Sequence, residues 1–382
     1  MDQSFDYGGP RQRLTEKLVN LNWGLVLLLA MIGGVGIAML YSAANGAWNP
    51  WAEKQAIRFG VAALVMLAVA LVDLRFWLRI AYWFYGVVML LLIAVELRGA
   101  IGMGAQRWID LGVIQIQPSE LMKIGAMLAL ARYFNGVGVE EVGRPLRLIV
   151  PALLILVPAA LVLKQPDLGT ALMLVLGGGA MFFLAGVRLW QFGVVLLGGV
   201  SAVPIAWRFL RDYQKNRIYT FLDPENDPLG AGYHSLQSKI AIGSGGMTGK
   251  GFLMGTQSHL SFLPERQTDF IFTMLAEEWG LIGCLALIGL YVLVFVYGYA
   301  IAFRSRSHFG RLLALGITVN LFLYVFINTA MVIGLIPVVG VPLPLISYGG
   351  TAMLTVMFGF GLLMSVYVHR DARIGRFGEG VE

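Results

Sequence analysis

The sequence predicts an all-α polytopic membrane protein, with ten transmembrane helices, one large extracytoplasmic loop and both termini in the cytoplasm. Composition is the first reason. Of the 382 residues, 58% are hydrophobic and only 13% are charged, and the mean hydropathy is +0.75. A soluble domain carries about 25% charged residues, so this chain cannot cover a water-exposed surface. Composition therefore excludes a soluble enzyme and a disordered chain, and the single cysteine, Cys284, excludes a disulfide-built domain.

Apolar segments of membrane-spanning length are the second reason, since a transmembrane helix needs about 20 mostly apolar residues. The ten candidate segments are 22–41, 56–73, 77–95, 119–134, 146–163, 168–186, 190–209, 270–303, 310–336 and 350–369. The fourth carries two charges in its first turn, so we expect hydropathy alone to score it weakly. The sequence thus divides into a cytoplasmic segment 1–21, a membrane domain 22–369 with the large extracytoplasmic loop 208–268, and a cytoplasmic tail 370–382.

The distribution of basic residues sets the expected orientation. With the N-terminus inside, fifteen lysines and arginines fall on cytoplasmic segments and six on short external ones. Positive charge accumulates on the cytoplasmic side of membrane proteins, and long loops such as 208–268 are left out of that count. Most of the net charge of +6 is explained in this way, which leaves little support for nucleic-acid binding.

Polar residues gather where the even-numbered helices begin, at the outer face in this topology. The four starts are Gln117-Pro118-Ser119-Glu120, Gln165-Pro166-Asp167, Thr268-Asp269-Phe270 and Ser347-Tyr348-Gly349-Gly350. Proline suits the first turn of a helix because its missing N–H has no helical partner there. Helix N-termini carry partial positive charge and free N–H groups. Several such ends around one cavity would bind an anionic head group.

Charged groups at membrane depth usually mark a function or are paired. Glu120 and Lys123 lie three residues apart and share a helix face, so they either form a salt bridge that fixes packing or present Lys123 to a phosphate. Asp167 is either an N-terminal cap or a site residue. Asp269 lies where a polar loop meets an apolar helix, and partial desolvation makes a carboxylate a better proton acceptor. Capping is again the alternative for Asp269.

The segment 208–268 mixes basic and aromatic residues, which suits an anionic, sugar-bearing lipid, although a solvated loop of mixed charge has the same composition. Arg217, Lys239 and Arg266 are its candidate substrate-binding residues. The glycine-rich stretch 243–251 resembles a phosphate loop, but its spacing is wrong and Gly251 replaces the required Ser or Thr. We interpret this stretch as a flexible or tight-turning loop beside a substrate cleft.

Several motifs, taken together, resemble the signature of the SEDS family, the shape, elongation, division and sporulation proteins of bacteria. They are Gly104-Ala105-Gln106-Arg107-Trp108-Ile109, Gln117-Pro118-Ser119-Glu120, Gln165-Pro166-Asp167-Leu168-Gly169-Thr170, Leu263-Pro264-Glu265-Arg266-Gln267-Thr268-Asp269-Phe270-Ile271-Phe272 and Pro344-Leu345-Ile346-Ser347-Tyr348-Gly349-Gly350. They follow the family order over nearly the whole chain. Pro-Glu-Arg at 264–266 resembles the cell-elongation branch, and Gln267 stands where many relatives carry His.

The resemblance implies a ten-helix glycosyltransferase of the bacterial inner membrane that polymerises lipid II into peptidoglycan strands with a class B penicillin-binding protein. The family's essential aspartate matches Asp269, and its charged cavity residues match Glu120, Lys123 and Asp167. A divalent cation, Mg or Mn, is also a family expectation, with Asp269 as a candidate ligand, and no nucleotide cofactor is expected. Two alternatives remain open on the sequence alone: a flippase for the same lipid, and a non-catalytic scaffold of the cell-wall machinery.

Overall fold

The computed structural model describes residues 14–98, 100–102, 105–110, 115–138, 140–209, 212–223, 231–256, 266–372 and 374–375. Most of the predicted terminal segments 1–21 and 370–382 lies outside these ranges. The helices are α1 (Leu14–Val19), α2 (Trp23–Ala43), α3 (Ala52–Leu71), α4 (Leu74–Arg98), α5 (Pro118–Gly136), α6 (Pro145–Lys164), α7 (Leu168–Ala185), α8 (Leu189–Phe209), α9 (Asp212–Leu222), α10 (Ala231–Gly245), α12 (Ile271–Arg304), α13 (His308–Ile333) and α14 (Gly350–Val368).

Every one of the ten predicted apolar segments is a helix, with its ends within four residues of the expected positions. Among the described residues, eight helices are long and apolar enough to cross a membrane. The two that fall short are α8, whose qualifying stretch Leu189–Pro204 is shorter, and α5, which carries Glu120, Lys123 and Arg132. The expectation that hydropathy scores the fourth segment weakly is thus confirmed. The chain is a mostly helical, multi-pass membrane protein.

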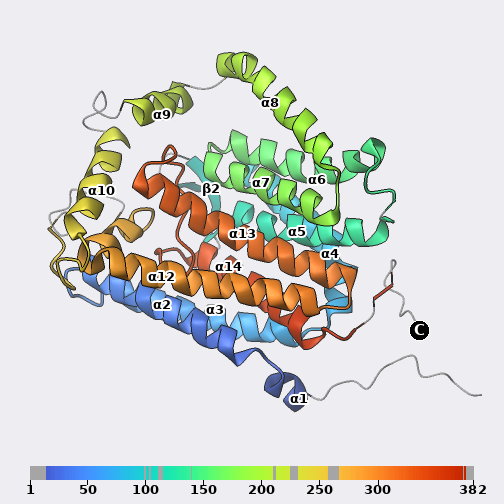
Figure 1. The fold of residues 1–382 in the computed structure, drawn as a ribbon, viewed down its shortest axis with the longest axis horizontal. Helices are drawn as coiled ribbons and strands as arrows, with labels where there is room; N and C mark the ends of the chain where they lie inside the picture. Colours follow the sequence, from blue (N-terminus) through green and yellow to red (C-terminus); the bar gives the residue numbers. More distant parts are fainter. Residues whose placement is uncertain are drawn as a thin grey trace, which may run out of the picture.

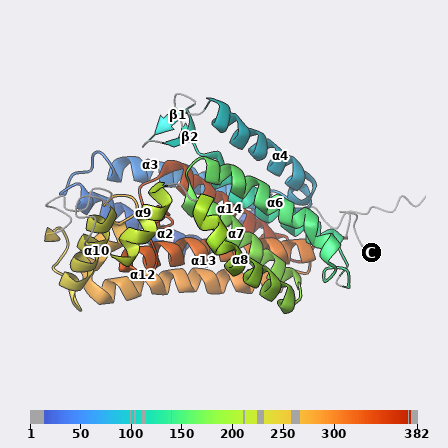
Figure 2. The ribbon, with the colours of Figure 1, turned by 90° about the horizontal axis from the view of Figure 1, so that it is seen from above.

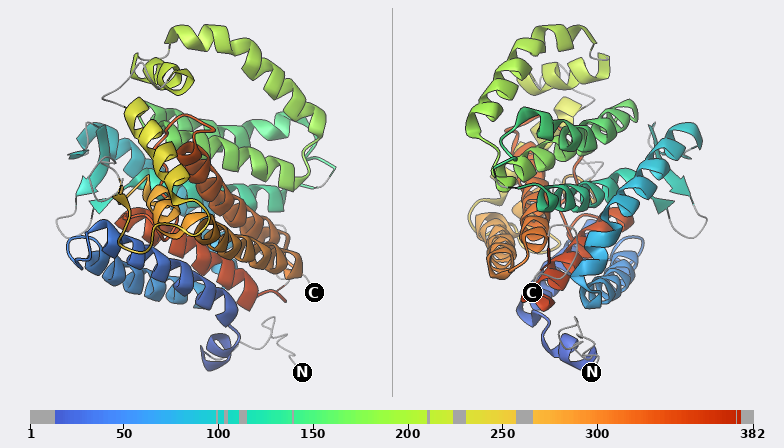
Figure 3. Two further views of the ribbon diagram at one scale, coloured as in Figure 1. Left: turned by 60° about the vertical axis from the view of Figure 1, so that its left-hand side comes forward. Right: turned by 90° about the vertical axis from the view of Figure 1, so that its right-hand side faces the viewer.

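The helices pack around α13 and α14, which are the most buried of the candidate spans. Figure 1 shows α12 and α13 side by side, with α2 and α3 on one side of them and α6 and α7 on the other. Helix α14 packs against α3, α5, α12 and α13. Seen from above, α4 and the strands lie opposite α12 (Figure 2), and α8 and α9 lie at the outer edge of the molecule (Figure 3).

The first and last described helices meet at one end of the bundle, beside the turn between α3 and α4. The Lys17 ammonium of α1 donates to Leu71 O at 3.0 Å. The Ser365 hydroxyl, in the last turn of α14, donates to Val72 O at 2.7 Å. Helix α1 and the last turn of α14 therefore lie at the same end of the bundle.

A small antiparallel sheet connects α4 to α5. Its strands are β1 (Ala100–Gly102), β2 (Ala105–Asp110) and β3 (Gln115–Ile116), in the order β1-β2-β3. The Arg107 guanidinium of β2 donates to Gln165 O at 2.9 Å and to Pro166 O, and Thr351 Oγ1 donates to Gln115 O at 2.8 Å. The sheet therefore ties the starts of α7 and α14 together.

The segment 208–268 is more regular than the predicted loop. Helices α9 and α10 lie within it, and α10 packs against α12 and α13. The Ser238 hydroxyl of α10 lies 2.7 Å from Thr273 Oγ1 and donates to Val332 O at 2.9 Å. Because these contacts are buried, α10 is packed into the helical bundle and is not a solvated loop.

Candidate active site

The starts of α5, α7, α12 and α14 are joined by a chain of contacts. Before α5, Gln117 Nε2 donates to Asp167 Oδ2 at 3.2 Å, which links α5 to α7. In the first turn of α7, a Cβ on Gly169 would lie 2.6 Å from Val339 O, so the segment 334–349 packs against that turn. The same segment contacts the turn 266–270 before α12 and leads directly into α14. The expected convergence of these four helix starts is present.

Glu120 and Lys123 form the predicted ion pair, with 2.6 Å between Lys123 Nζ and Glu120 Oε1 and side chains 1% and 4% exposed for the lysine and the glutamate. Tyr324 of α13 completes the group. Its hydroxyl donates to Glu120 Oε2 at 2.5 Å, and the Lys123 ammonium lies 4.1 Å from the centroid of its ring. Lys123 Nζ also lies 3.9 Å from Met173 Sδ on α7. The pair is thus buried, and both of its members also contact side chains of neighbouring helices.

Asp167 is the N-terminal cap of α7, as the capping interpretation predicts. Its Oδ1 accepts from the Thr170 N–H at 3.0 Å and its Oδ2 from the Thr170 hydroxyl at 3.0 Å. Gln117 donates to Oδ2 as well. The carboxylate is buried, with 6% of the residue exposed. Asp167 therefore organises the junction between two helix starts.

The backbone of the turn that carries Asp269 is hydrogen-bonded by α13 and by the segment that precedes α14. Asn328 Nδ2 of α13 donates to Asp269 O at 3.0 Å and to Val341 O at 2.7 Å. Ser347 Oγ donates to Thr268 O at 2.7 Å, and the Tyr348 N–H donates to Gln267 O at 2.9 Å. With its backbone fixed in this way, Asp269 is only partly buried. A carboxylate held on a rigid, partly desolvated turn has the features of a general base.

The N-cap residue of α12 is Phe270, which makes no side-chain capping hydrogen bond. A Cβ on Gly340 would lie 3.3 Å from Asp269 Oδ2, so the carboxylate rests against the backbone of the segment 334–349. Gly340 has a φ of 71°, a conformation that favours glycine.

The three candidates from the segment 208–268 have different surroundings. The Arg266 guanidinium lies 6.0 Å from the centroid of the Trp51 ring, and burial lowers its pKa below the ordinary value for arginine. Lys239 is exposed and packs against Gly334, the left-handed cap that ends α13. A cation at a helix C-terminus is stabilised by the helix dipole, so Lys239 has a structural role at the end of α13 besides any contact with substrate. Arg217 lies on α9, and its side chain is outside the described part of the chain.

Sequence reasoning overlooked Tyr324 and Asn328, both on α13. Together with Asn320 they form a row at four-residue spacing, buried on one face of an otherwise apolar helix. That periodic row of polar groups at membrane depth is a signal that could have identified them.

The residues that the structure describes contain no cluster of three or more His, Cys, Asp or Glu side chains able to hold a metal ion. Mg²⁺ is often held by one or two carboxylates together with substrate phosphates. The single carboxylate of Asp269 fits only a cation of that shared kind.

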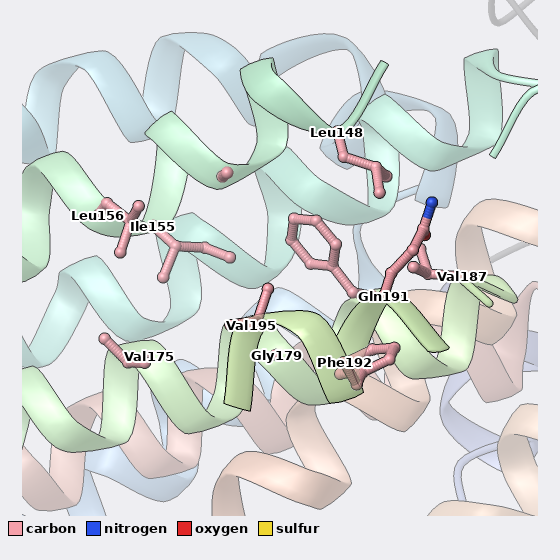
Figure 4. A pocket seen from close by; sticks show the side chains of 11 residues that line it. Leu148, Ile155, Leu156, Val175, Gly179, Val187, Gln191, Phe192 and Val195 are labelled. Atoms are coloured by element: carbon pink, nitrogen blue, oxygen red, sulfur yellow. The ribbon is translucent and has the colours of Figure 1, made fainter. Parts of the chain in front are cut away.

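A separate cavity of about 300 Å³ lies between α6, α7 and α8 (Figure 4). It is lined by Leu148, Ala152, Ile155, Leu156, Val175, Gly179, Phe182, Val187, Gln191, Phe192 and Val195. The one polar side chain in this lining, Gln191, donates to Gly143 O at 2.9 Å. The cavity therefore lacks the charged groups that characterise the site at the helix starts.

The fold and the site define a polytopic membrane protein with charged groups at converging helix starts. The family model for FtsW, RodA and SpoVE, described as a cell cycle protein, matches residues 18–372, and the chain belongs to this family, the SEDS proteins. Among its relatives is the peptidoglycan glycosyltransferase MrdB of Escherichia coli K12, 46% identical over 349 residues, which cover 91% of this chain and 93% of the relative. The peptidoglycan glycosyltransferase RodA of Treponema pallidum is 34% identical, with 90% and 96% covered.

Solved structures agree with these relationships. A chain from a peptidoglycan synthase complex, described as coordinating polymerization and crosslinking, matches with a TM-score of 0.80 and 34% identity over 92% of this chain and 98% of that chain. The RodA protein of Thermus thermophilus matches with a TM-score of 0.69 and 31% identity over 92% and 97%.

Proposed function

We propose that this protein is a peptidoglycan glycosyltransferase that polymerises lipid II into glycan strands at the outer face of the bacterial inner membrane during cell elongation. The observation that carries the proposal is the fixed turn of Asp269 among four linked helix starts, in a chain 46% identical to a peptidoglycan glycosyltransferase. The excess of basic residues on the predicted cytoplasmic segments supports ten crossings with both termini inside. In that orientation the four helix starts face outward.

The reaction joins two lipid-linked sugars. A hydroxyl of the acceptor sugar attacks the anomeric carbon of the donor, the bond to the donor's pyrophosphate breaks, and the hydroxyl proton is removed. Asp269 accepts this proton. A positioned base contributes about 10²–10⁴-fold in rate, and the activated donor supplies the energy, so no nucleotide is needed.

The departing pyrophosphate requires cationic partners. Arg266, three residues before Asp269 and partly exposed, is the accessible cation of this turn. Lys123 is buried by Tyr324 and Met173, so it contributes positive potential to the site at the helix starts and positions Glu120. We assign Lys239 and Arg217 to the lipid head group. Asp269 would be the protein ligand of a divalent cation, which would supply positive charge for the departing pyrophosphate.

The partner we infer is a class B penicillin-binding protein that crosslinks the new strands. The similarity to a chain from a peptidoglycan synthase complex supports this inference. A cytoplasmic-membrane location follows from the lipid substrate.

The test compares the wild-type protein with Asp269→Ala and Asp269→Asn, each purified in detergent with and without the partner and incubated with lipid II. We expect a ladder of glycan polymer from wild type and a loss of about 10²–10⁴-fold from both variants, with unchanged thermal stability. Normal polymerisation by a folded Asp269→Ala protein would remove the aspartate from catalysis. Movement of labelled lipid II across vesicles without polymer would instead identify a flippase. Normal cell shape with Asp269→Asn and no polymer from wild type would indicate a scaffold.

Chelation tests the cation separately. We expect a chelator to slow polymerisation and added Mg²⁺ or Mn²⁺ to restore it, with no change in the thermal stability of the substrate-free protein. Full activity in excess chelator would exclude a cation from the reaction.

A further inference from the structure

Helix α12 is interrupted inside the apolar span at Gly280, whose φ of 65° and ψ of −162° are not helical. A break in a helix leaves carbonyls before it and N–H groups after it without helical partners. Inside a membrane each such group costs several kcal/mol when it is unsatisfied. The interruption is therefore stable only if another part of the chain supplies the missing hydrogen bonds.

The glycine-rich segment that follows α10 supplies them. The N–H groups of Lys250 and Gly251 donate to the carbonyls of Glu277 and Glu278, both at 3.0 Å. After the break, the N–H of Leu281 donates to Gly246 O at 2.9 Å, and the N–H of Ile282 donates to Met247 O at 3.2 Å. Residues 246–251, which we call the inlay, thus bridge the two halves of α12.

The approach is close enough to require glycine on both sides. A Cβ on Gly249 would lie 2.1 Å from Glu278 O, and one on Gly280 would lie 2.3 Å from Gly249 N. Both residues also have φ values in the left-handed region, 79° and 65°. The glycine-rich composition, which resembles a phosphate loop in the sequence, is explained by the close packing of this segment's backbone against the backbone of α12.

One ion pair fastens the inlay to α12. Lys250 Nζ lies 2.8 Å from Glu277 Oε1, with side chains 28% and 0% exposed. The Thr256 hydroxyl donates to the same oxygen at 3.1 Å and accepts from Lys250 at 2.7 Å. A buried carboxylate without a partner is strongly unfavourable, and Lys250 and Thr256 both supply partners to Glu277 beside the break.

The first part of α12, residues 271–279, is consequently a short helix that follows Asp269 directly and is held at both ends. Asn328 and the segment that carries Ser347 fix its start, and the inlay fixes its end. Because the helix is broken at Gly280, residues 281–304 do not hold residues 271–279 in place. The hydrogen bonds from the inlay do so instead, and residues 271–279 lead directly from the Asp269 turn.

We propose that Lys250 and Glu277 are a positioning pair for Asp269, acting through the inlay without contacting substrate. This inference rests on the proposed glycosyltransferase function. A misplacement of about 1 Å in a catalytic group can cost up to about 10²-fold in rate. Loss of the pair therefore lowers kcat and leaves KM for lipid II nearly unchanged, since the pair makes no contribution to substrate binding.

The experiment measures kcat and KM for lipid II polymerisation with Lys250→Met, Lys250→Arg and the double variant Lys250→Met/Glu277→Gln. The double variant leaves no uncompensated buried carboxylate, so it folds even where Lys250→Met does not. The matched control is Arg147→Met, which breaks an exposed pair with Glu141 at 3.5 Å far from this region of the sequence.

We expect a fall in kcat of about 10- to 100-fold for Lys250→Met and for the double variant, with KM within about twofold. Lys250→Arg, which retains the charge, keeps most of the rate, and the control behaves as wild type. A folded double variant with wild-type kcat, or one whose KM rises while kcat holds, overturns the inference. A wild-type protein that makes no polymer overturns the proposed function instead.

Discussion

The phenol of Tyr324 contacts both members of the buried ion pair: its hydroxyl donates to Glu120 Oε2 at 2.5 Å, and its ring lies 4.1 Å from the Lys123 ammonium. One aromatic side chain from α13 thus holds an acid and a base of α5 in a fixed arrangement. A hydrogen bond to a charged group and a cation–π contact are both strengthened by burial.

Tyr324→Phe retains the ring over Lys123 and removes only the hydroxyl. We expect it to lower the stability of the folded protein by about 1–3 kcal/mol, because Glu120 loses a donor in a dry environment. We expect polymerisation to fall as well, because loss of the hydroxyl alters the charge arrangement of the pair at the helix starts. Thermal unfolding in detergent and a lipid II assay measure the two effects. Tyr85→Phe, which removes a hydrogen bond to Leu154 O at 3.0 Å, is the control.

The two interpretations of Glu120 and Lys123 are separated by a double variant. Removing one partner of a buried ion pair costs about 3–5 kcal/mol, whereas neutralising both with residues of similar volume is often harmless to stability. We expect Lys123→Met alone to be strongly destabilised and Glu120→Gln/Lys123→Met to regain most of the loss. If the pair serves only packing, the double variant polymerises lipid II at the wild-type rate. If it serves the reaction, stability returns and activity does not.

Substitutions of Asp167 separate its capping role from a role of its charge in the reaction. Asparagine caps helices about as well as aspartate, whereas alanine at a cap costs about 1 kcal/mol. Asp167→Asn should therefore keep the stability that Asp167→Ala loses. A large fall in polymerisation with Asp167→Asn would show that the charge is required. Normal activity with Asp167→Asn would restrict this residue to the junction between α5 and α7.

Gly340→Ala tests whether the segment 334–349 holds the Asp269 carboxylate in place. Its Cβ would lie 3.3 Å from Asp269 Oδ2 at a φ of 71°, so we expect backbone strain and displacement of the carboxylate. Gly186→Ala is the matched control, because it has a φ of 93° with nothing within 4 Å of its Cβ. Equal loss of stability with a selective loss of activity in Gly340→Ala is the expected result. Equal activity in the two variants would contradict a role for Gly340 in placing Asp269.

The sequence by itself determined the ten apolar helical segments, to within four residues at each end. An apolar run of about 20 residues has few alternatives in a membrane. Proline and capping residues located the start of α7, and the spacing of Glu120 and Lys123 implied their pair. These features are local, so a linear pattern carries them.

Tertiary structure alone decided which groups meet. Tyr324 lies 204 residues from Glu120 in the chain, and no local pattern connects a row of polar residues on α13 to the pair on α5. The break at Gly280 is invisible to hydropathy, since residues 270–303 form one predominantly apolar segment. It is stable only when residues 246–251 bridge it. Buried backbone groups must find partners, and in this protein the partners come from distant parts of the chain.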